Sequence, residues 1–248
     1  NRSHGYTTAF DQKIREFGGH IEYNTRVDKI LVKNGEVVGV ETSNGETIEA
    51  NYIISNASPT LVYNKLIYPK SEVPEMGYKE VNARIHGLSA FCIYLGLDAS
   101  VKELGLKEYS YFLMDEMDTE DIYESWRHLE APRSQATVVI NNAVSDCSPP
   151  STTLLYITIL FRPEAWKDVK PENYFKVKRD IAEKLIIQFE EATGAPIREH
   201  IEEIEISTPE TYARYTGTYN GIIYGYEPES WDSLVPRLMS MGKDQYVE

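Results

Sequence analysis

Residues 18–59 read GGHIEYNTRVDKILVKNGEVVGVETSNGETIEANYIISNASP, and the turn signals in this stretch decide the fold around it. The Gly18-Gly19 pair is typical of a helix end, because glycine takes positive φ at little cost. The Asn-Gly pairs at 34–35 and 44–45 are typical of tight hairpin turns. The β-branched residues around these turns therefore predict a meander of short strands over residues 27–48.

A helix and a buried strand are expected on either side of the meander. Apolar residues at helical spacing predict an amphipathic helix over residues 6–17. The apolar run YIIS at 52–55 is short enough to be a buried strand. It leads into the small-residue turn NASP at 56–59, after which a second helix is expected.

This order of helix, meander, strand and turn resembles the middle segment of a family of flavin-dependent oxidoreductases. The family includes phytoene desaturases, carotenoid isomerases and retinol saturases. The motifs that carry the resemblance are GGHI at 18–21, NTRVDKI at 24–30, GEVVGV at 35–40 and SNASP at 55–59. Each motif alone is weak, whereas their combination is specific. By periodicity alone, the segment also fits an ordinary β-meander of an α+β protein.

Five further apolar runs predict strands, and one long amphipathic run predicts a helix. The expected strands are 88–97, 109–113, 135–141, 152–161 and 200–207, and the expected helix is 174–193. In the family that the chain resembles, this part is a substrate-binding domain, and the family's Tyr-Leu-Gly-Leu-Asp strand end is similar to residues 94–98. The loop 146–150 departs from the family pattern at Cys147. The implied fold class is α+β, with a mostly antiparallel sheet flanked by helices plus a β-meander slice of an FAD-binding domain.

The resemblance also implies a domain order. Residues 1–58 would be part of the FAD-binding domain, residues 59–225 the substrate-binding domain, and residues 226–248 a loop-like connection back toward the FAD-binding part. The chain contains no Gly-x-Gly-x-x-Gly turn, which a dinucleotide-binding unit places at a helix N-terminus. It also begins with Asn1 rather than Met. We therefore expect an internal fragment of a longer enzyme that does not retain FAD by itself.

Four residues are implied to face the cofactor in the longer protein. Val27 lies on the strand that supplies a backbone contact to adenine in related flavoproteins. Asn56, Ala57 and Ser58 form the turn at a strand's carboxyl end, where α/β folds bind ligands. Val27 also fits a core valine, and Asn56 also fits a helix N-cap ahead of Pro59. No catalytic residue is assigned.

The chain has 18 tyrosines, and several fall on predicted strands or in the segment 212–224. An aromatic-lined sheet suits a long apolar polyene, with hydroxyl groups at the mouth of the pocket. The candidates for substrate binding are Tyr111, Tyr156, Tyr215, Tyr219 and Tyr224. For each single tyrosine, the alternative is that it fills a half-buried sheet surface.

The composition argues against several classes of protein. A net charge of −14 does not suit a nucleic-acid partner, which requires clustered Lys and Arg. Cys92 and Cys147 are isolated, which fits a reduced, cytoplasmic protein. No apolar run reaches the ~18 residues of a membrane-spanning helix, although peripheral membrane contact stays open. No zinc or calcium pattern predicts a metal site, and no Gly-x-Ser-x-Gly elbow predicts a serine hydrolase.

The resemblance therefore implies the substrate-domain fragment of an FAD-dependent oxidoreductase. The longer enzyme would be a desaturase, saturase or isomerase of a polyene or another apolar substrate. FAD would carry the redox chemistry, and the protein would supply an apolar tunnel and orientation. The alternative is a non-catalytic binding module that holds an apolar ligand or a protein partner in a sheet cleft. The sequence leaves substrate identity, reaction direction and oligomeric state open.

Overall fold

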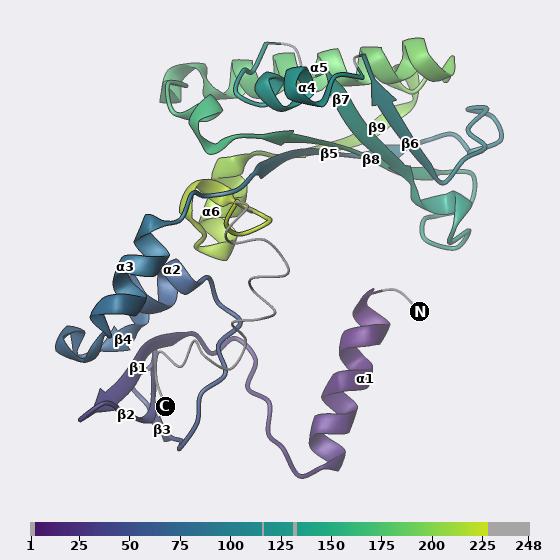
Figure 1. Cartoon of the computed structure of the whole chain (residues 1–248). Helices are drawn as coiled ribbons and strands as arrows, with labels where there is room; N and C mark the ends of the chain where they lie inside the picture. The colour runs from purple at the N-terminus through teal and green to yellow at the C-terminus, as the bar shows by residue number, and fades with distance from the viewer. Residues whose placement is uncertain (1–2, 116, 131–132, 228–248) are drawn as a thin grey trace. The chain divides into compact units, whose positions relative to one another are not determined.

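The computed structural model describes residues 3–115, 117–130 and 133–227, and its elements form two units that divide between Asn82 and Ala83 (Figure 1). The fold class is α+β, as predicted, with a mixed four-stranded sheet in the first unit and an antiparallel five-stranded sheet in the second. The helices are α1 Ser3–Glu16, α2 Pro59–Leu61, α3 Glu75–Ala83, α4 Thr119–Ser125, α5 Tyr174–Thr193 and α6 Pro209–Thr216. The strands are β1 Val27–Lys33, β2 Glu36–Thr42, β3 Thr47–Glu49, β4 Ile67–Tyr68, β5 Ser89–Leu97, β6 Ser110–Met114, β7 Ser134–Val139, β8 Thr153–Phe161 and β9 Ile201–Ser207.

The meander predicted from the Asn-Gly pairs is confirmed in the first unit. β1, β2 and β3 pair antiparallel in sequence order, and β4 pairs parallel with the other side of β1. Asn34 and Gly35 have φ values of 56° and 82°, as the type I′ hairpin turn requires. On β2, a Cβ at Gly39 would lie 2.3 Å from the carbonyl oxygen of Ile48. Glycine is therefore needed where β2 and β3 approach each other.

The strand predicted at 52–55 is absent. This segment forms no ladder with any described strand, and Tyr52 and Ile54 are 89% and 99% exposed. Both sides of β1 are already occupied, by β2 and β4. A strand needs a neighbour that satisfies its backbone N–H and C=O groups, and an apolar run does not specify that neighbour. Ile53 packs against the buried core of this unit, which consists of Ile30, Val32 and Ile67.

The first helix ends where the Gly-Gly pair predicts. Gly18 has a φ of 84°, and its N–H donates to the carbonyl oxygen of Arg15 at 2.9 Å. Phe10 on α1 and Phe17 directly after it belong to the expected apolar stripe, but both are exposed. Hydrogen bonds along its own backbone therefore hold α1 more than a packed apolar face does.

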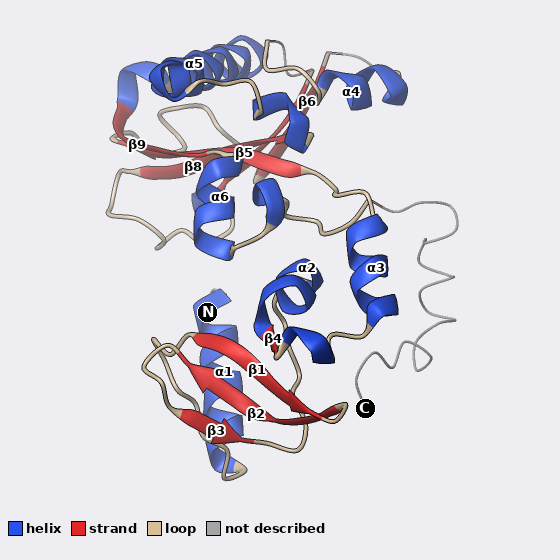
Figure 2. Cartoon of the chain, turned by 90° about the vertical axis from the view of Figure 1, so that its left-hand side faces the viewer, coloured by secondary structure: helices blue, strands red, loops and turns tan. Residues whose placement is uncertain are grey.

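The second unit is built around a sheet with the strand order β6-β7-β8-β5-β9. Each of these strands begins and ends within two residues of its predicted range. α5 covers one face of the sheet, and α6 lies on the other (Figures 1 and 2). Along β8, buried and half-buried residues alternate from Thr153 to Phe161, because successive side chains of a strand point to opposite faces.

The buried face of this sheet forms the main core with α5. Its fully buried side chains include Phe91, Ile93, Leu155 and Ile157 from the sheet and Leu185 and Phe189 from α5. α5 ends at Gly194, which has a φ of 73°, as predicted for a C′ glycine. On the other side, α6 begins with a capping box in which Thr208 and Thr211 exchange side chain–backbone hydrogen bonds.

Candidate functional site

The first unit contains a pocket of about 710 Å³ beside the start of β1. Three of the four residues implied to face the cofactor line this pocket, namely Val27, Asn56 and Ala57. Its apolar wall comes from Ile30, Val40, Ile53, Leu61 and Leu66. A cleft of this volume suits a small molecule or one part of a larger cofactor. The structure thus brings together residues that lie about thirty positions apart in the sequence, while their contact with FAD stays a prediction.

A bulge and an unpaired strand edge shape the backbone around Val27. β1 and β2 slip by one residue between Val27 and Lys29, so Asp28 is the extra residue of a β-bulge. β4 pairs only with Ile30 and Leu31 of β1, so no described strand pairs with Val27 on that side. The backbone of Val27 therefore remains available on the pocket wall for a ligand.

The turn that follows residue 55 leads directly into the next helix. Ser58 occupies the N-cap position of α2, and its carbonyl oxygen accepts from the Val62 N–H at 3.0 Å. The interpretation of Asn56 as this N-cap is therefore wrong. In the described structure Ser58 is also not among the pocket-lining residues. A π-helical turn, η1 at Val62–Leu66, follows α2, and such turns are frequent at functional sites.

The rim of this pocket is charged. Arg26 Nε donates to Asp28 Oδ1 at 2.7 Å, and this hydrogen bond with the guanidinium lowers the pKa of Asp28. The Arg26 side chain is 77% exposed and that of Asp28 is half-buried, so the pair adds little stability and the guanidinium remains available to a ligand. Lys65 adds a second positive charge to the wall. Apolar walls with cationic groups at the rim suit an aromatic ring that carries an anionic substituent.

The predicted substrate tyrosines of the second sheet lie on opposite faces. Tyr156 lies on the face that carries α6, hereafter the open face, where its ring is 6.3 Å from the ring of Tyr94. Tyr111 lies on the face covered by α5, with its ring edge-on to Phe189 at 5.4 Å. A pocket on one face of the sheet cannot include both tyrosines. Whether either of them contacts a substrate stays a prediction.

The other three predicted tyrosines lie on α6 and the segment after it. Tyr215 of α6 and Tyr224 are largely exposed. Tyr219 begins the short turn η7, Tyr219–Gly221, and stacks on His86 with ring centroids 4.4 Å apart. These positions place three rings at the surface of the second unit, and their role in substrate binding stays a prediction.

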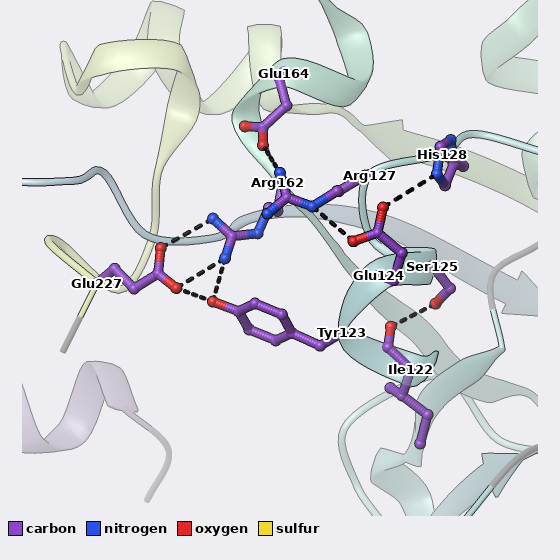
Figure 3. Close-up of polar contacts among 9 residues, drawn as sticks. All are labelled: Ile122, Tyr123, Glu124, Ser125, Arg127, His128, Arg162, Glu164 and Glu227. Atoms are coloured by element: carbon purple, nitrogen blue, oxygen red, sulfur yellow. Dashed lines mark hydrogen bonds and ion pairs between the residues drawn. The ribbon is translucent and has the colours of Figure 1, made fainter. Parts of the chain in front are cut away.

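A buried ion-pair network at the end of β8 has no counterpart among the sequence predictions (Figure 3). The two terminal nitrogens of Arg162 donate to the carboxylate of Glu227 at 2.9 and 2.8 Å, and the hydroxyl of Tyr123 contacts both partners. The guanidinium also lies 4.4 Å from the centre of the Tyr123 ring. The side chains of Arg162 and Glu227 are 9% and 19% exposed. Water therefore screens this pair much less than a surface pair.

The network ties the segment after η7 to the sheet. Backbone hydrogen bonds from Ile223 to Leu88 and from Glu227 to Ile85 run beside the Arg162–Glu227 pair. The partners of Arg162 are 39 and 65 residues away from it in the chain. No local pattern marks pairs at such separations, so the sequence offers no signal for this network.

A second cluster joins α6 to the open face of the sheet. The hydroxyl of Tyr212 donates to Cys92 Sγ at 3.1 Å and lies 3.4 Å from the hydroxyl of Tyr94. Thr158 Oγ1 lies 3.3 Å from the same sulfur. Burial raises the pKa of both Tyr212 and Tyr94, so both phenols stay protonated at neutral pH. The strand alternation of residues 88–97 places Cys92 and Tyr94 on one face, which is the sequence signal that points to this cluster.

Within residues 3–115, 117–130 and 133–227, no group of three or more His, Cys, Asp or Glu side chains is arranged to hold a metal ion. In the same ranges, no helix combines the length and the apolar content needed to cross a membrane.

Residues 6–234 match the family model described as flavin containing amine oxidoreductase. The chain belongs to this family. Its curated relatives include a chloroplastic prolycopene isomerase of Daucus carota, 28% identical over 226 residues that cover 91% of this chain and 35% of the relative. They also include an all-trans-retinol 13,14-reductase of Danio rerio, 26% identical over 86% of this chain and 38% of the relative. The resemblance to isomerases and saturases is thereby confirmed.

An all-trans-zeta-carotene desaturase of Myxococcus xanthus is 24% identical over 90% of this chain and 41% of its own length. Among solved structures, an oxidoreductase from Methanosarcina mazei has a TM-score of 0.50 at 17% identity, over 80% of this chain and 40% of that chain. A reduced UDP-galactopyranose mutase has a TM-score of 0.51 at 12% identity, over 81% and 37%. At such identities the structures show a shared fold alone. The chain thus spans well under half the length of these relatives.

Proposed function

We propose that this chain is part of an FAD-dependent oxidoreductase that desaturates, saturates or isomerises an apolar polyene. The observation that carries the proposal is that Val27, Asn56 and Ala57 line one pocket in a chain of a flavin-containing family. FAD would supply the redox chemistry when bound, and the protein would bind and orient the cofactor and the substrate.

The pocket of the first unit suits one end of the cofactor. Apolar side chains on its wall offer contact to a planar ring, and the unpaired backbone of Val27 offers hydrogen bonds to the edge of that ring. Arg26 and Lys65 offer positive charge to a phosphate. The chain has no Gly-x-Gly-x-x-Gly turn to cradle a pyrophosphate. We therefore expect weak binding of FAD by this chain alone.

The names of the relatives and the open face of the second sheet support the substrate class. The relatives above are named for prolycopene, all-trans-retinol and zeta-carotene, all of which are long and mainly apolar. On the open face, Phe112 is 71% exposed, and Val138 and Tyr156 are half-buried beside it. An apolar polyene lying on these residues would remove them from water, which favours binding. Peripheral contact with a membrane and a cytoplasmic location belong to the same proposal.

Nuclear magnetic resonance of the isotope-labelled chain tests the cofactor pocket. Adenosine monophosphate at millimolar concentration should shift the backbone amides of residues 26–28 and 55–57. The variant Ala57→Leu should remove these shifts by filling the pocket, whereas Ala9→Leu on the exposed surface of α1 should preserve them. Shifts confined to other regions would contradict the assignment of the pocket. Tight stoichiometric binding of FAD would contradict the expectation that the chain does not retain the cofactor.

A further inference from the structure

The sheet of the second unit ends at β6, and no described strand pairs with the outer side of this strand (Figure 1). The backbone groups of Tyr109 and Asp115, on either side of β6, form hydrogen bonds toward β7. In an antiparallel ladder, alternate residues bond the same neighbour, and the residues between them point their backbone groups the other way. The N–H and C=O groups directed outward are therefore those of Ser110, Phe112 and Met114.

The two edges of this sheet differ in their side chains. β9, at the opposite edge, carries the exposed residues Glu202, Glu203 and Glu205. Charged side chains on an edge strand oppose the addition of a further strand. β6 has the uncharged sequence SYFLM, and its Phe112 and Met114 are 71% and 56% exposed. The described sheet is therefore suited to a further strand at β6 rather than at β9.

A groove of about 570 Å³ lies between β6, the start of β7 and the last turns of α5. Asp115 and Glu191, which are both exposed, line this groove together with Gln188. Arg133 also lines it, but its guanidinium already lies 3.9 Å from a carboxylate oxygen of Asp121. The groove therefore offers carboxylate groups to a cationic side chain.

Strand alternation defines which side chains of an added strand would reach the groove. Tyr111 and Leu113 point to the face covered by α5, where both pack against the main core. Directly opposite residues of paired strands point to the same face, so residues opposite these two would meet the carboxylates. Residues opposite Phe112 and Met114 would lie on the open face beside apolar side chains. A matching segment thus alternates basic and apolar residues.

We propose that β6 and the adjoining groove bind an extended segment of a partner protein in which basic and apolar residues alternate. Outward backbone groups of β6 would hold this segment as a further strand, and the groove would select its basic side chains. A second copy of this chain is a poorer occupant, because each copy carries a net charge of −14 and the two would repel each other. The proposal depends neither on the cofactor nor on the polyene.

A labelled peptide of alternating lysine and valine tests the proposal on the 248-residue chain, with fluorescence anisotropy as the measure of binding. A peptide of the same composition, with all lysines before all valines, keeps the charge and loses the alternation. The alternating peptide should bind about tenfold more tightly, because only it presents both kinds of side chain while it pairs with β6. Methylation of its valine nitrogens should abolish binding, whereas methylation of its lysine nitrogens should preserve it, since the valine N–H groups face β6.

Two matched pairs of variants locate the peptide. Phe112→Pro removes an outward N–H and leaves the ladder to β7 intact, and Phe112→Ala removes the same ring but keeps that N–H. Binding should be about tenfold weaker in the proline variant than in the alanine variant. Glu191→Lys should weaken binding about fivefold. Glu172→Lys makes the same change in net charge ahead of the other end of α5 and should leave the affinity unchanged.

Several results would overturn the proposal. No binding of the alternating peptide would do so directly, and equal binding of the block peptide would show attraction by charge alone. Unchanged affinity in Phe112→Pro would place the peptide elsewhere, for instance at β9. A dimer in sedimentation velocity that is lost in Phe112→Pro would assign this edge to a second copy instead. Should Phe112→Pro not fold, the methylated peptides and Glu191→Lys give the answer.

Discussion

The sheet of the second unit packs a continuous layer of large apolar side chains under α5, whereas the buried apolar cluster of the first unit consists of Ile30, Val32 and Ile67 in the described residues. Apolar residues of the first unit that do not fit into this core, such as Phe17 and Ile54, are exposed instead. Different interactions therefore stabilise the two units. Long-range burial holds the second unit together, and turn chemistry with hairpin pairing holds much of the first.

The largest expected effect is in the core of the second unit. Phe189→Ala should lower the free energy of unfolding by about 3–5 kcal/mol, because a fully buried ring is replaced by a cavity. Urea unfolding followed by the fluorescence of Trp166, which lies in the same core, measures this. Phe175→Ala on the same helix is the control, since its ring is largely exposed, and a change within about 0.5 kcal/mol is expected. Equal effects of the two variants would contradict the described core.

The second-largest loss of stability is expected from the Arg162–Glu227 network at the end of β8. Arg162→Met should cost about 3 kcal/mol of unfolding free energy, because the carboxylate of Glu227 loses the guanidinium of Arg162 in a place with little water. The double variant Arg162→Met with Glu227→Leu should recover part of this loss. Arg127→Met removes a more exposed pair with Glu124 and Glu164 and should cost less than about 1 kcal/mol. A double variant as unstable as Arg162→Met would show that the charge of Glu227 is not the cause.

A smaller effect should appear on mild acidification. The His86 ring stacks on Tyr219 and lies near the tilted ring of Tyr226. Its Nδ1 has no hydrogen-bond partner in the described structure, and burial lowers the pKa of His86. The unfolded chain therefore binds a proton more readily than the folded chain. Stability present above about pH 6.5, the ordinary pKa of histidine, should fall as the pH drops toward the lower folded value. Denaturant unfolding midpoints measured between neutral pH and pH ~5.5 give the change of stability with pH. This change should be smaller in His86→Phe. The same change of stability with pH in His86→Phe would show that protonation of His86 is not its cause.

The smallest effect should come from the apolar surface of the first unit. Phe17→Ser should change the unfolding free energy of this chain by no more than about 0.5 kcal/mol, because the ring is 87% exposed. Ile67→Ala in the buried core of the same unit is the comparison and should cost about 2–5 kcal/mol. Since residues 1–82 contain no tryptophan, circular dichroism is the suitable measurement. A large loss in Phe17→Ser would show that α1 is packed more tightly than described.

Sequence signals located the helices and strands well where the periodicity was long or the turn was chemically specific. The apolar run at 152–161 and the helical spacing of 174–193 correctly predicted β8 and α5. The run at 52–55 failed because strand formation depends on a partner strand. For the candidate site, the residues Val27, Asn56 and Ala57 came from family motifs, and no local pattern would have selected them.

The sequence by itself determined the meander, the five strands and long helix of the second unit, and the family to which the chain belongs. These features depend on local spacing, on glycine and asparagine at positive φ, and on short motifs. Only the tertiary structure decided that Tyr111 and Tyr156 lie on opposite faces, that Arg162 meets Glu227, and that Tyr212 reaches Cys92. Such pairs form because sheet pairing and helix packing bring distant residues together. The local pattern of residues along the chain does not indicate which of them will meet.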